Sequence, residues 1–348
     1  MPLAYPCRMA VNVILLFGGD GSEHRVSVAS AQNLCSVLPD AECWFWSRTG
    51  PVWCPPRRAL VDHKRPFESD FAPPGLPRWK DLPSAINEIF AGSVVFLAVH
   101  GGSGEDGTVQ RWLEAKGAKF TGSSAAASAL AFDKEKAKQV ARNAGVSTTE
   151  SATVSGRDLH TAEKVIEDML AAHGRLVMKP VADGSSSGLM FVEPCNRKNA
   201  IAQLTSMPDI TFMLERFLRG RELTVGVLER TTGSTVPLPC SEVLLDEGRS
   251  FDFEGKYLGK GTKEITPAEL PQTVAQNAQR LALTVHKAIG CSGYSRTDMI
   301  ITDSGPIFLE INTLPGLTQA SFIPQQLQIV GISMREFAEE QIQLASSR

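Results

Sequence analysis

Two segments of the sequence share one order, in which an apolar run is followed by a glycine loop and then by a helical pattern. In the first, the apolar residues 11–17 precede GGDGSE and the amphipathic stretch HRVSVASAQNLCSVL. In the second, SVVFLAVH (residues 93–100) precedes GGSGEDGT and VQRWLEAKG. Continuous apolar runs of this length are typical of strands buried on both faces. The repetition therefore predicts a parallel α/β sheet in the first third of the chain.

The pattern changes after residue 122. An alanine- and lysine-rich tract predicts helix there, and short apolar runs with glycine-containing links, among them RLVMKPV and TFMLERFL, predict antiparallel strands. A long helix is expected over residues 270–289, and SRTDMIITDSGPIFLEIN predicts a hairpin. Residues 51–83 are rich in proline and charge and predict a long surface excursion. With 348 residues, we expect three domains: 1–121, 122–214 and 215–348.

Charge and cysteine usage exclude several classes of protein. The net charge of −3 gives no general attraction to nucleic acid or to an anionic membrane. Seven cysteines without a CxxC motif are typical of reduced thiols in a cytosolic protein. The apolar run at residues 11–17 is too short to span a bilayer and lacks a cleavage site. We therefore expect a cytoplasmic protein that binds neither nucleic acid nor membrane.

The expected hairpin carries a candidate metal site. Glu310 and Asn312 lie two residues apart and so share one face of a strand, and a turn at residues 304–305 would bring Asp298 opposite Glu310. Opposed carboxylates destabilise a sheet unless a cation neutralises them, and hard oxygen ligands suit magnesium. The alternative is that both acids are ordinary solvated strand residues.

Two neighbouring features of the hairpin also indicate an anionic ligand. Arg296, on the same face, could stabilise a developing oxyanion, or it could simply pair with Asp298. Gly316 lets the backbone approach a ligand closely and offer its N–H to an anion.

Neither of the two common nucleotide-binding glycine loops is present. Instead, Lys179 precedes a glycine- and serine-rich loop (residues 184–188) whose composition suits a lid over phosphates, or alternatively a plain surface turn. Glu215 and Glu222 flank Phe217 and Leu218, which could form a purine slot or merely a strand edge with solvated acids.

Together these segments resemble the D-alanine-D-alanine ligase family, which has the ATP-grasp fold. The resemblance covers nearly the whole chain and rests on segments in the family's order: FGGDGSEHRVSVASA, AVHGGSGEDGTVQRWLE, TGSSAAASALAFDKEKAK, KPVADGSSSGL, LERFLRGRELTVGVL, FDFEGKYL, SRTDMI and LEINTLPGLTQASFIP.

The resemblance implies an ATP site between the central and C-terminal sheets. Adenine would lie near Glu215, Phe217 and Leu218, and the ribose near Glu222. The phosphates would contact Lys134, which could otherwise be a helix-surface charge, Lys179 and Lys256, and two magnesium or manganese ions would bind Asp298, Glu310 and Asn312.

The resemblance also implies a two-step ligation of two D-alanine molecules through an acyl phosphate, for peptidoglycan precursors. Glu23 would bind the first ammonium group and orient Ser185 and Tyr257, although an acid at a helix start is also favoured by the helix dipole. Arg296 and the Gly316 N–H would bind the oxyanion, His100 would lie near the first substrate, and Ser321 near the second carboxylate.

The family resemblance also implies that the phenolic Tyr257 goes with an amide product, and it implies a homodimer. The competing functions are a ligase of the same fold that joins other small amino acids in secondary metabolism, and a nucleotide-binding regulator without catalysis.

Overall fold

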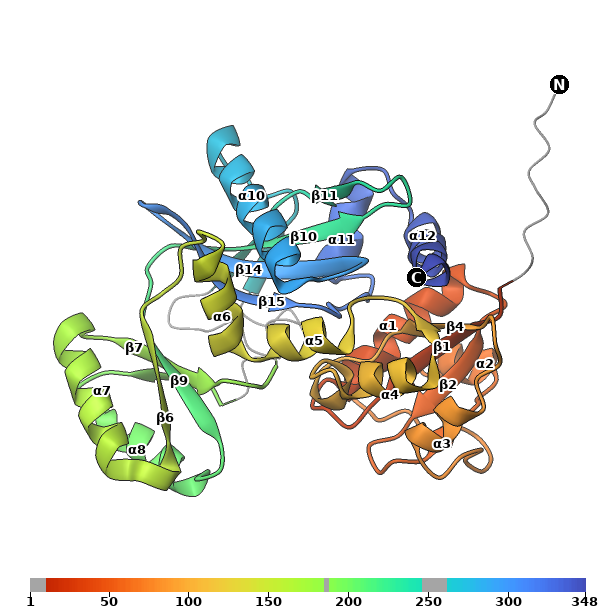
Figure 1. The fold of residues 1–348 in the computed structure, drawn as a ribbon, viewed down its shortest axis with the longest axis horizontal. Helices are drawn as coiled ribbons and strands as arrows, with labels where there is room; N and C mark the ends of the chain where they lie inside the picture. The colour runs from red at the N-terminus through yellow and green to blue at the C-terminus, as the bar shows by residue number, and fades with distance from the viewer. Residues whose placement is uncertain (1–10, 185–187, 246–261) are drawn as a thin grey trace.

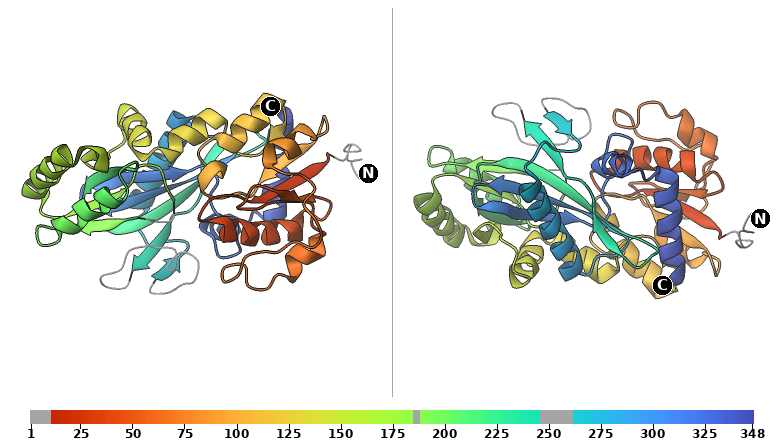
Figure 2. Two further views of the ribbon diagram at one scale, coloured as in Figure 1. Left: turned by 90° about the horizontal axis from the view of Figure 1, so that it is seen from below. Right: turned by 90° about the horizontal axis from the view of Figure 1, so that it is seen from above.

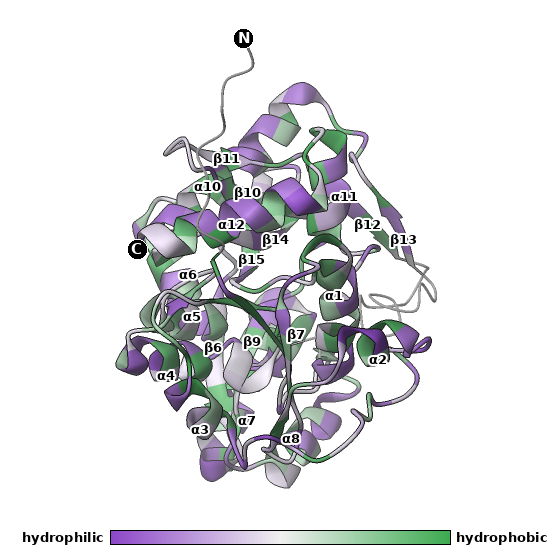
Figure 3. Ribbon diagram, turned by 90° about the vertical axis from the view of Figure 1, so that its right-hand side faces the viewer, coloured by the Kyte–Doolittle hydropathy of each residue, from purple (hydrophilic) through white to green (hydrophobic). Residues whose placement is uncertain are grey.

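The structure, a computed structural model, describes residues 11–184, 188–245 and 262–348. Figure 1 shows three sheets along the molecule, with the N-terminal sheet at one end and a small sheet with α7 and α8 at the other. In Figure 3 the helices carry both green and purple stretches, as expected for helices that pack one face on a sheet and expose the other. No helix in the described ranges combines the length and apolar character needed to cross a bilayer.

The N-terminal sheet has the order β3-β2-β1-β4-β5. β1 pairs in parallel with β2 and β4, and β4 with β5, which confirms the predicted parallel α/β arrangement. Its elements are β1 (Val13–Gly18), α1 (His24–Val37), β2 (Glu42–Trp46), β3 (Val52–Trp53), α2 (Arg57–Asp62), α3 (Leu82–Asn87), β4 (Val94–Leu97), the 3-10 helix η1 (Gly102–Gly104), α4 (Thr108–Lys116) and β5 (Lys119–Phe120).

The prediction of a surface excursion over residues 51–83 was wrong in part. This segment contains β3, α2 and the start of α3, and it buries Val52, Leu60, Phe71 and Trp79 in the N-terminal core. The elements are too short for a periodic pattern to emerge between the prolines. Single apolar anchors attach them to the core instead.

The small sheet has the order β6-β9-β7-β8, and all its pairings are antiparallel. α7 and α8 pack on this sheet and share its core. Its elements are β6 (Ser151–Ser155), the 3-10 helix η2 (Gly156–Asp158), α7 (Leu159–His173), β7 (Leu176–Pro180), β8 (Met190–Val192), α8 (Arg197–Ser206) and β9 (Thr211–Arg216).

The third sheet has six strands in the order β13-β12-β10-β14-β15, with β11 paired to β10. The long helix and the hairpin expected from the sequence are both present, as α10 and as β14 with β15. Its elements are β10 (Arg221–Glu229), β11 (Thr235–Pro237), β12 (Ser241–Leu245), β13 (Thr262–Ile265), α10 (Gln272–Ile289), β14 (Tyr294–Thr302) and β15 (Gly305–Asn312).

The alanine-rich tract forms two helices, α5 (Ala125–Phe132) and α6 (Lys134–Asn143). Asp133 ends the first and caps the second, because its carboxylate accepts the backbone N–H of Lys136. Both helices share a core with the six-stranded sheet, although they precede the small sheet in sequence. They therefore form part of the layer behind the hairpin.

The last helix of the chain returns to the N-terminal sheet. α11 (Phe322–Ile329) lies beside β10, and α12 (Met334–Ser347) packs against α1, β4 and β5. Figure 2 shows α12 alongside the N-terminal sheet. Apolar side chains of α12, including Phe337 and Ile342, belong to the same core as β1 and β4.

Candidate active site

The hairpin of β14 and β15 brings four polar side chains onto one face. Its register pairs Asp298 with Glu310, as the sequence predicted, and it also pairs Arg296 with Asn312. Because residues two apart on a strand share a face, all four side chains project to the same side of the sheet.

The Asp298 carboxylate is held by three neighbours. Arg296 contacts it with two nitrogens, Nε at 2.9 Å from Oδ1 and Nη2 at 2.8 Å from Oδ2. Thr224 on β10 donates its hydroxyl to Oδ1 at 2.5 Å, and the Asn312 amide donates to Oδ2 at 3.3 Å. The salt bridge that was one of the two interpretations of Arg296 is therefore present, and it fixes the guanidinium beside the carboxylates.

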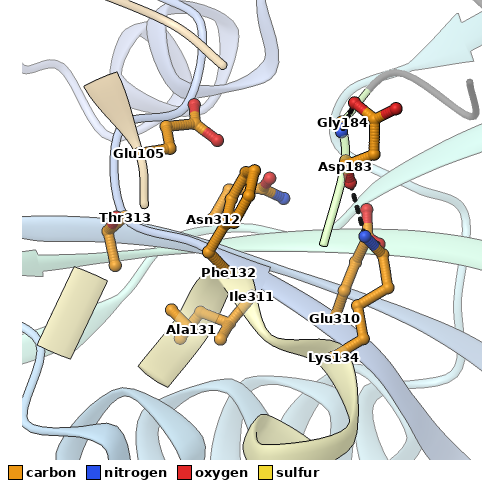
Figure 4. A pocket seen from close by; sticks show the side chains of 10 residues that line it. All are labelled: Glu105, Ala131, Phe132, Lys134, Asp183, Gly184, Glu310, Ile311, Asn312 and Thr313. Atoms are coloured by element: carbon orange, nitrogen blue, oxygen red, sulfur yellow. Dashed lines mark hydrogen bonds and ion pairs between the residues drawn. The ribbon is translucent and has the colours of Figure 1, made fainter. Parts of the chain in front are cut away.

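Lys134 lies at the rim of a pocket next to the hairpin rather than on an open helix surface. Its side chain is only 10% exposed, and Nζ lies 3.7 Å from Glu310 Oε2. It also donates to the backbone oxygen of Asp183 at 2.5 Å, drawn as a dashed line in Figure 4. The pocket is lined by Glu105, Ala131, Phe132, Lys134, Asp183, Gly184, Glu310, Ile311, Asn312 and Thr313.

The oxygen donors of the hairpin suit a hard divalent cation. Asp298, Glu310 and Asn312 offer carboxylate and amide oxygens, the types that magnesium prefers. Each carboxylate already lies next to a cationic side chain, Arg296 or Lys134, which offsets part of its negative charge. The described residues contain no cluster of three or more His, Cys, Asp or Glu suited to a metal. A cation here would therefore depend on Asn312 and on ligand oxygens as well.

A buried charge cluster lies at the small sheet. Glu215 on β9 is 3% exposed and forms ion pairs with Lys138 and with Lys179, whose Nζ lies 2.7 Å from Oε2. Thr149 donates to the same carboxylate and accepts from Lys138 at 2.5 Å. Burial, and then the charge of Lys179, lower the pKa of Lys138. Two lysines therefore converge on one carboxylate inside the protein.

Sequence reasoning missed Lys138. A lysine in an amphipathic helix is usually predicted to lie on the surface, yet Lys138 is fully buried. The signal that could have identified it is its position four residues after Lys134, which places both on one face of α6.

The expected purine slot follows β9. The guanidinium of Arg175 stacks on Phe217, 4.3 Å from the ring centre, and on Phe191 at 4.6 Å. Leu218 is half-buried, and Glu222 lies near the start of β10, opposite Val243 and Ile300. Phe217 and Leu218 lie in the link between β9 of the small sheet and β10 of the six-stranded sheet.

Glu23 lies where two glycine loops meet. It is 8% exposed at the start of α1 and forms no side-chain cap with that helix. A Cβ built on Gly184 would lie 2.8 Å from its Oε2, and one on Gly101 would lie 3.2 Å away. Glycine at both positions therefore allows the backbone to approach this carboxylate closely.

Glu105 is a second acid that sequence reasoning missed. It follows η1, is 8% exposed and lines the pocket in Figure 4 near Asn312 and Thr313. Burial, followed by the nearby Glu23 carboxylate, raises the pKa of Glu105 to about 8. At neutral pH it holds a proton, so it can donate a hydrogen bond into the pocket.

The loop after β15 carries Gly316 and Ser321. Thr318 donates its N–H to the Ser321 hydroxyl at 3.2 Å, and the two hydroxyls are 2.8 Å apart. A Cβ at Gly316 would lie 2.8 Å from that same hydroxyl, so only glycine fits without displacing it. The buried His100 contacts this loop at the oxygen of Leu314.

Three of the site residues that the family resemblance implies lie outside the described residues: Ser185, Lys256 and Tyr257.

Comparison with known families covers almost the whole chain. Residues 12–123 match the family model described as D-ala D-ala ligase N-terminus, and residues 140–343 match the model described as D-ala D-ala ligase C-terminus.

Full-length relatives show the same similarity. The chain is 34% identical to the D-alanine–D-alanine ligase of Leptospira interrogans, over 97% of this chain and 98% of that protein. It is 35% identical to that of Rhizobium meliloti, over 96% and 98%. Among solved structures, the VanG D-Ala:D-Ser ligase from Enterococcus faecalis superposes with a TM-score of 0.80 at 29% identity, covering 96% of this chain and 99% of that one. The D-alanine-D-alanine ligase from Coxiella burnetii superposes with a TM-score of 0.80 at 25% identity, over 97% and 94%.

Proposed function

Because the chain belongs to the D-alanine–D-alanine ligase family, we propose how its own residues divide the work of that reaction. The reaction is the ATP-dependent joining of two D-alanine molecules into a peptidoglycan precursor, and the fold is ATP-grasp. The observation that carries the assignment is the single hairpin face with Arg296, Asp298, Glu310 and Asn312.

The carboxylates of this face are assigned to the metal. Asp298, Glu310 and Asn312 would hold magnesium, or manganese in its place, because their oxygen donors fit such an ion. A divalent cation bound there would neutralise charge on the phosphates and position them for transfer. Arg296 and Lys134 lie against the same carboxylates and would keep the face charge-balanced.

Lys179 is assigned to the phosphates, because its ammonium group lies beside Glu215 at the edge of the buried cluster and suits phosphate oxygens. The fully buried Lys138 would hold the Glu215 carboxylate in place. Lys134 is also assigned to the phosphates, because it lies at the pocket rim. Lys256 is assigned to the phosphates on the family resemblance alone. Glu215, Phe217, Leu218 and Glu222 would contact the adenosine at the link between the two sheets.

The amino-acid sites lie between α1 and the loop after β15. Glu23 would bind the ammonium group of the first D-alanine, supported by its burial between glycine loops, with Ser185 and Tyr257 as its partners. Ser321 would bind the carboxylate of the second D-alanine. The Gly316 N–H and the Arg296 guanidinium would stabilise negative charge on the acyl oxygen.

The chemistry then follows in two steps. The carboxylate of one D-alanine attacks the γ-phosphorus of ATP, the bond to ADP breaks, and an acyl phosphate forms. The neutral amine of the second D-alanine attacks the acyl carbon and forms a tetrahedral oxyanion. That oxyanion collapses with loss of phosphate and of the proton from the amine. Preorganised donors matter most for the second step, because charge develops there on one oxygen.

The test is phosphate release by purified protein with ATP and magnesium. D-Alanine, L-alanine, D-serine and D-alanine plus D-lactate are compared, and products are identified by mass. We expect D-alanine alone to give phosphate and the dipeptide mass. Turnover only with another amino acid would keep the ligase chemistry and refute the substrate assignment. ATP binding without any turnover would support a regulator.

Other sequence predictions stay predictions. They are the homodimer, the cytoplasmic location, the lack of nucleic-acid and membrane partners, and the division into domains 1–121, 122–214 and 215–348. Small-angle scattering would test the dimer.

A further inference from the structure

A closed set of hydrogen bonds links α1, the end of the second glycine unit and the loop after β15. His100 is 3% exposed, and both its ring nitrogens have protein partners. Nδ1 lies 2.8 Å from the carbonyl oxygen of Leu314, and Nε2 lies 2.8 Å from the hydroxyl of Ser30. Ser30 is fully buried, and its oxygen also receives the backbone N–H of Leu317 at 3.1 Å.

The donors and acceptors in this set follow from elementary chemistry. A carbonyl oxygen can only accept, so Nδ1 of His100 carries the hydrogen. The Ser30 oxygen already accepts from Leu317, so its own hydrogen is available for Nε2. Burial lowers the pKa of His100 and so favours the neutral ring, with the hydrogen on Nδ1 and with Nε2 as the acceptor of the Ser30 hydroxyl.

The hydrogen bonds of His100 and Ser30 hold the two ends of the segment 314–317. Leu314 is held through its carbonyl and Leu317 through its N–H, while Gly316 lies between them. On α1, Asn33 adds a third bond by donating to the Leu317 oxygen at 2.8 Å. The peptide groups on both sides of Leu317 are thus fixed to α1, whose N-cap residue is Glu23.

We propose that Ser30 is a positioning residue for the ligation, which acts with His100 to hold residues 314–317 so that the Gly316 N–H points at the reacting acyl oxygen. This inference rests on the proposed function, because it takes the role of Gly316 from there. It assigns His100 to the support of the loop through both its nitrogens. Loss of the Ser30 hydroxyl frees the Leu317 N–H and removes the donor to His100 together.

The chain offers a matched control on the same helix. Ser27 is also fully buried, accepts the N–H of Gly18 at 2.7 Å and donates to the oxygen of Ala98 at 2.6 Å. Ser27→Ala and Ser30→Ala each remove one buried hydroxyl with one accepted and one donated bond. They differ in what the hydroxyl holds, because Ser27 joins β1 to the end of β4 and Ser30 holds the loop.

The experiment compares the two variants with the wild type in kcat, in KM for D-alanine and ATP, and in Tm. We expect similar losses of Tm in both. For Ser30→Ala we expect a fall of roughly 10- to 100-fold in kcat, with KM for ATP unchanged. The reason is that displacing the Gly316 N–H weakens mainly its hydrogen bond to the transition state. For Ser27→Ala we expect kcat to change by less than about threefold, since its bonds lie away from the loop. Equal losses of kcat in both, an unchanged kcat in Ser30→Ala, or an effect only on KM for D-alanine would each overturn the proposal.

A second measurement does not depend on activity. Nitrogen-15 NMR of histidine-labelled wild type at neutral pH, with His100 assigned through His100→Gln, reports which ring nitrogen is protonated. Hydrogen on Nδ1 alone supports the hydrogen bonds inferred for His100 and Ser30, whereas hydrogen on Nε2 or on both nitrogens refutes them, even where Ser30→Ala does not fold. If the wild type shows no turnover with D-alanine, the proposed function fails, and this measurement still tests the hydrogen bonds of His100 and Ser30 on its own.

Discussion

Replacing Glu105 with glutamine should change the pH dependence of stability in a defined direction. The carboxyl group is 8% exposed, and burial, then the Glu23 carboxylate, raise its pKa from 4.5 to about 8. In the unfolded chain the group ionises near its ordinary value. Between these two pH values the unfolded state therefore releases a proton that the folded state keeps, and stability falls as pH rises.

The size of this effect follows from the difference between the two pKa values. A raised carboxyl pKa contributes stability that is fully present below pH 4.5 and is lost by the time the pH reaches about 8. Since one pKa unit corresponds to about 1.36 kcal/mol, the stability lost across this pH range is at most about 5 kcal/mol. Glu105→Gln keeps the shape and cannot ionise, so the variant should gain stability relative to wild type as pH rises across this window.

The assay is urea unfolding of both proteins at several pH values from 5 to 8.5, with a chelator and without nucleotide. The exposed Glu163→Gln serves as the control, because it removes a carboxylate without changing a buried site. We expect the difference in unfolding midpoint between Glu105→Gln and wild type to grow steadily with pH. A difference that stays flat or shrinks would show that Glu105 is ionised in the folded protein, and the reasoning from burial would be wrong.

Three further predictions concern charge and backbone geometry. Glu215→Gln should lower the free energy of unfolding by about 3–5 kcal/mol, measured by urea titration, because Lys138 is left buried without its counter-charge. A loss below about 1 kcal/mol would contradict this reasoning. Gly18→Ala should destabilise the folded protein more than Gly92→Ala, by at least about 2 kcal/mol. Both glycines have a positive φ, but only at Gly18 would a Cβ lie 2.1 Å from a backbone oxygen. Equal urea-unfolding midpoints for the two variants would refute the clash. Arg296→Ala should reduce turnover by roughly 100-fold or more while calorimetry still detects ATP binding, and near-normal turnover would exclude the oxyanion role.

The hairpin was predictable because its information is local. Alternation of side chains and a turn at residues 304–305 are enough to place Asp298 opposite Glu310, and the register agrees. The parallel N-terminal sheet was predictable for a similar reason, since each strand, loop and helix is contiguous in the sequence.

The buried charges were not predictable from local pattern. Lys138 and Glu215 are 77 residues apart, and only the folded chain brings Lys138 on α6 against Glu215 on β9. Glu105 reads as one more acid in a glycine loop, and its burial depends on β15 and on the loop that contains Gly184. The anchors Leu60 and Trp79 were hidden by the prolines and charges around them.

The packing of α12 has a consequence for synthesis of the protein. The N-terminal sheet is made first, yet part of its apolar cover comes from Phe337, Ala338 and Ile342, which leave the ribosome more than two hundred residues later. Until then this sheet exposes a surface that other apolar segments can occupy. We therefore expect the nascent first sheet to rely on chaperone protection, and to become protease-resistant only once residues 334–347 have been translated.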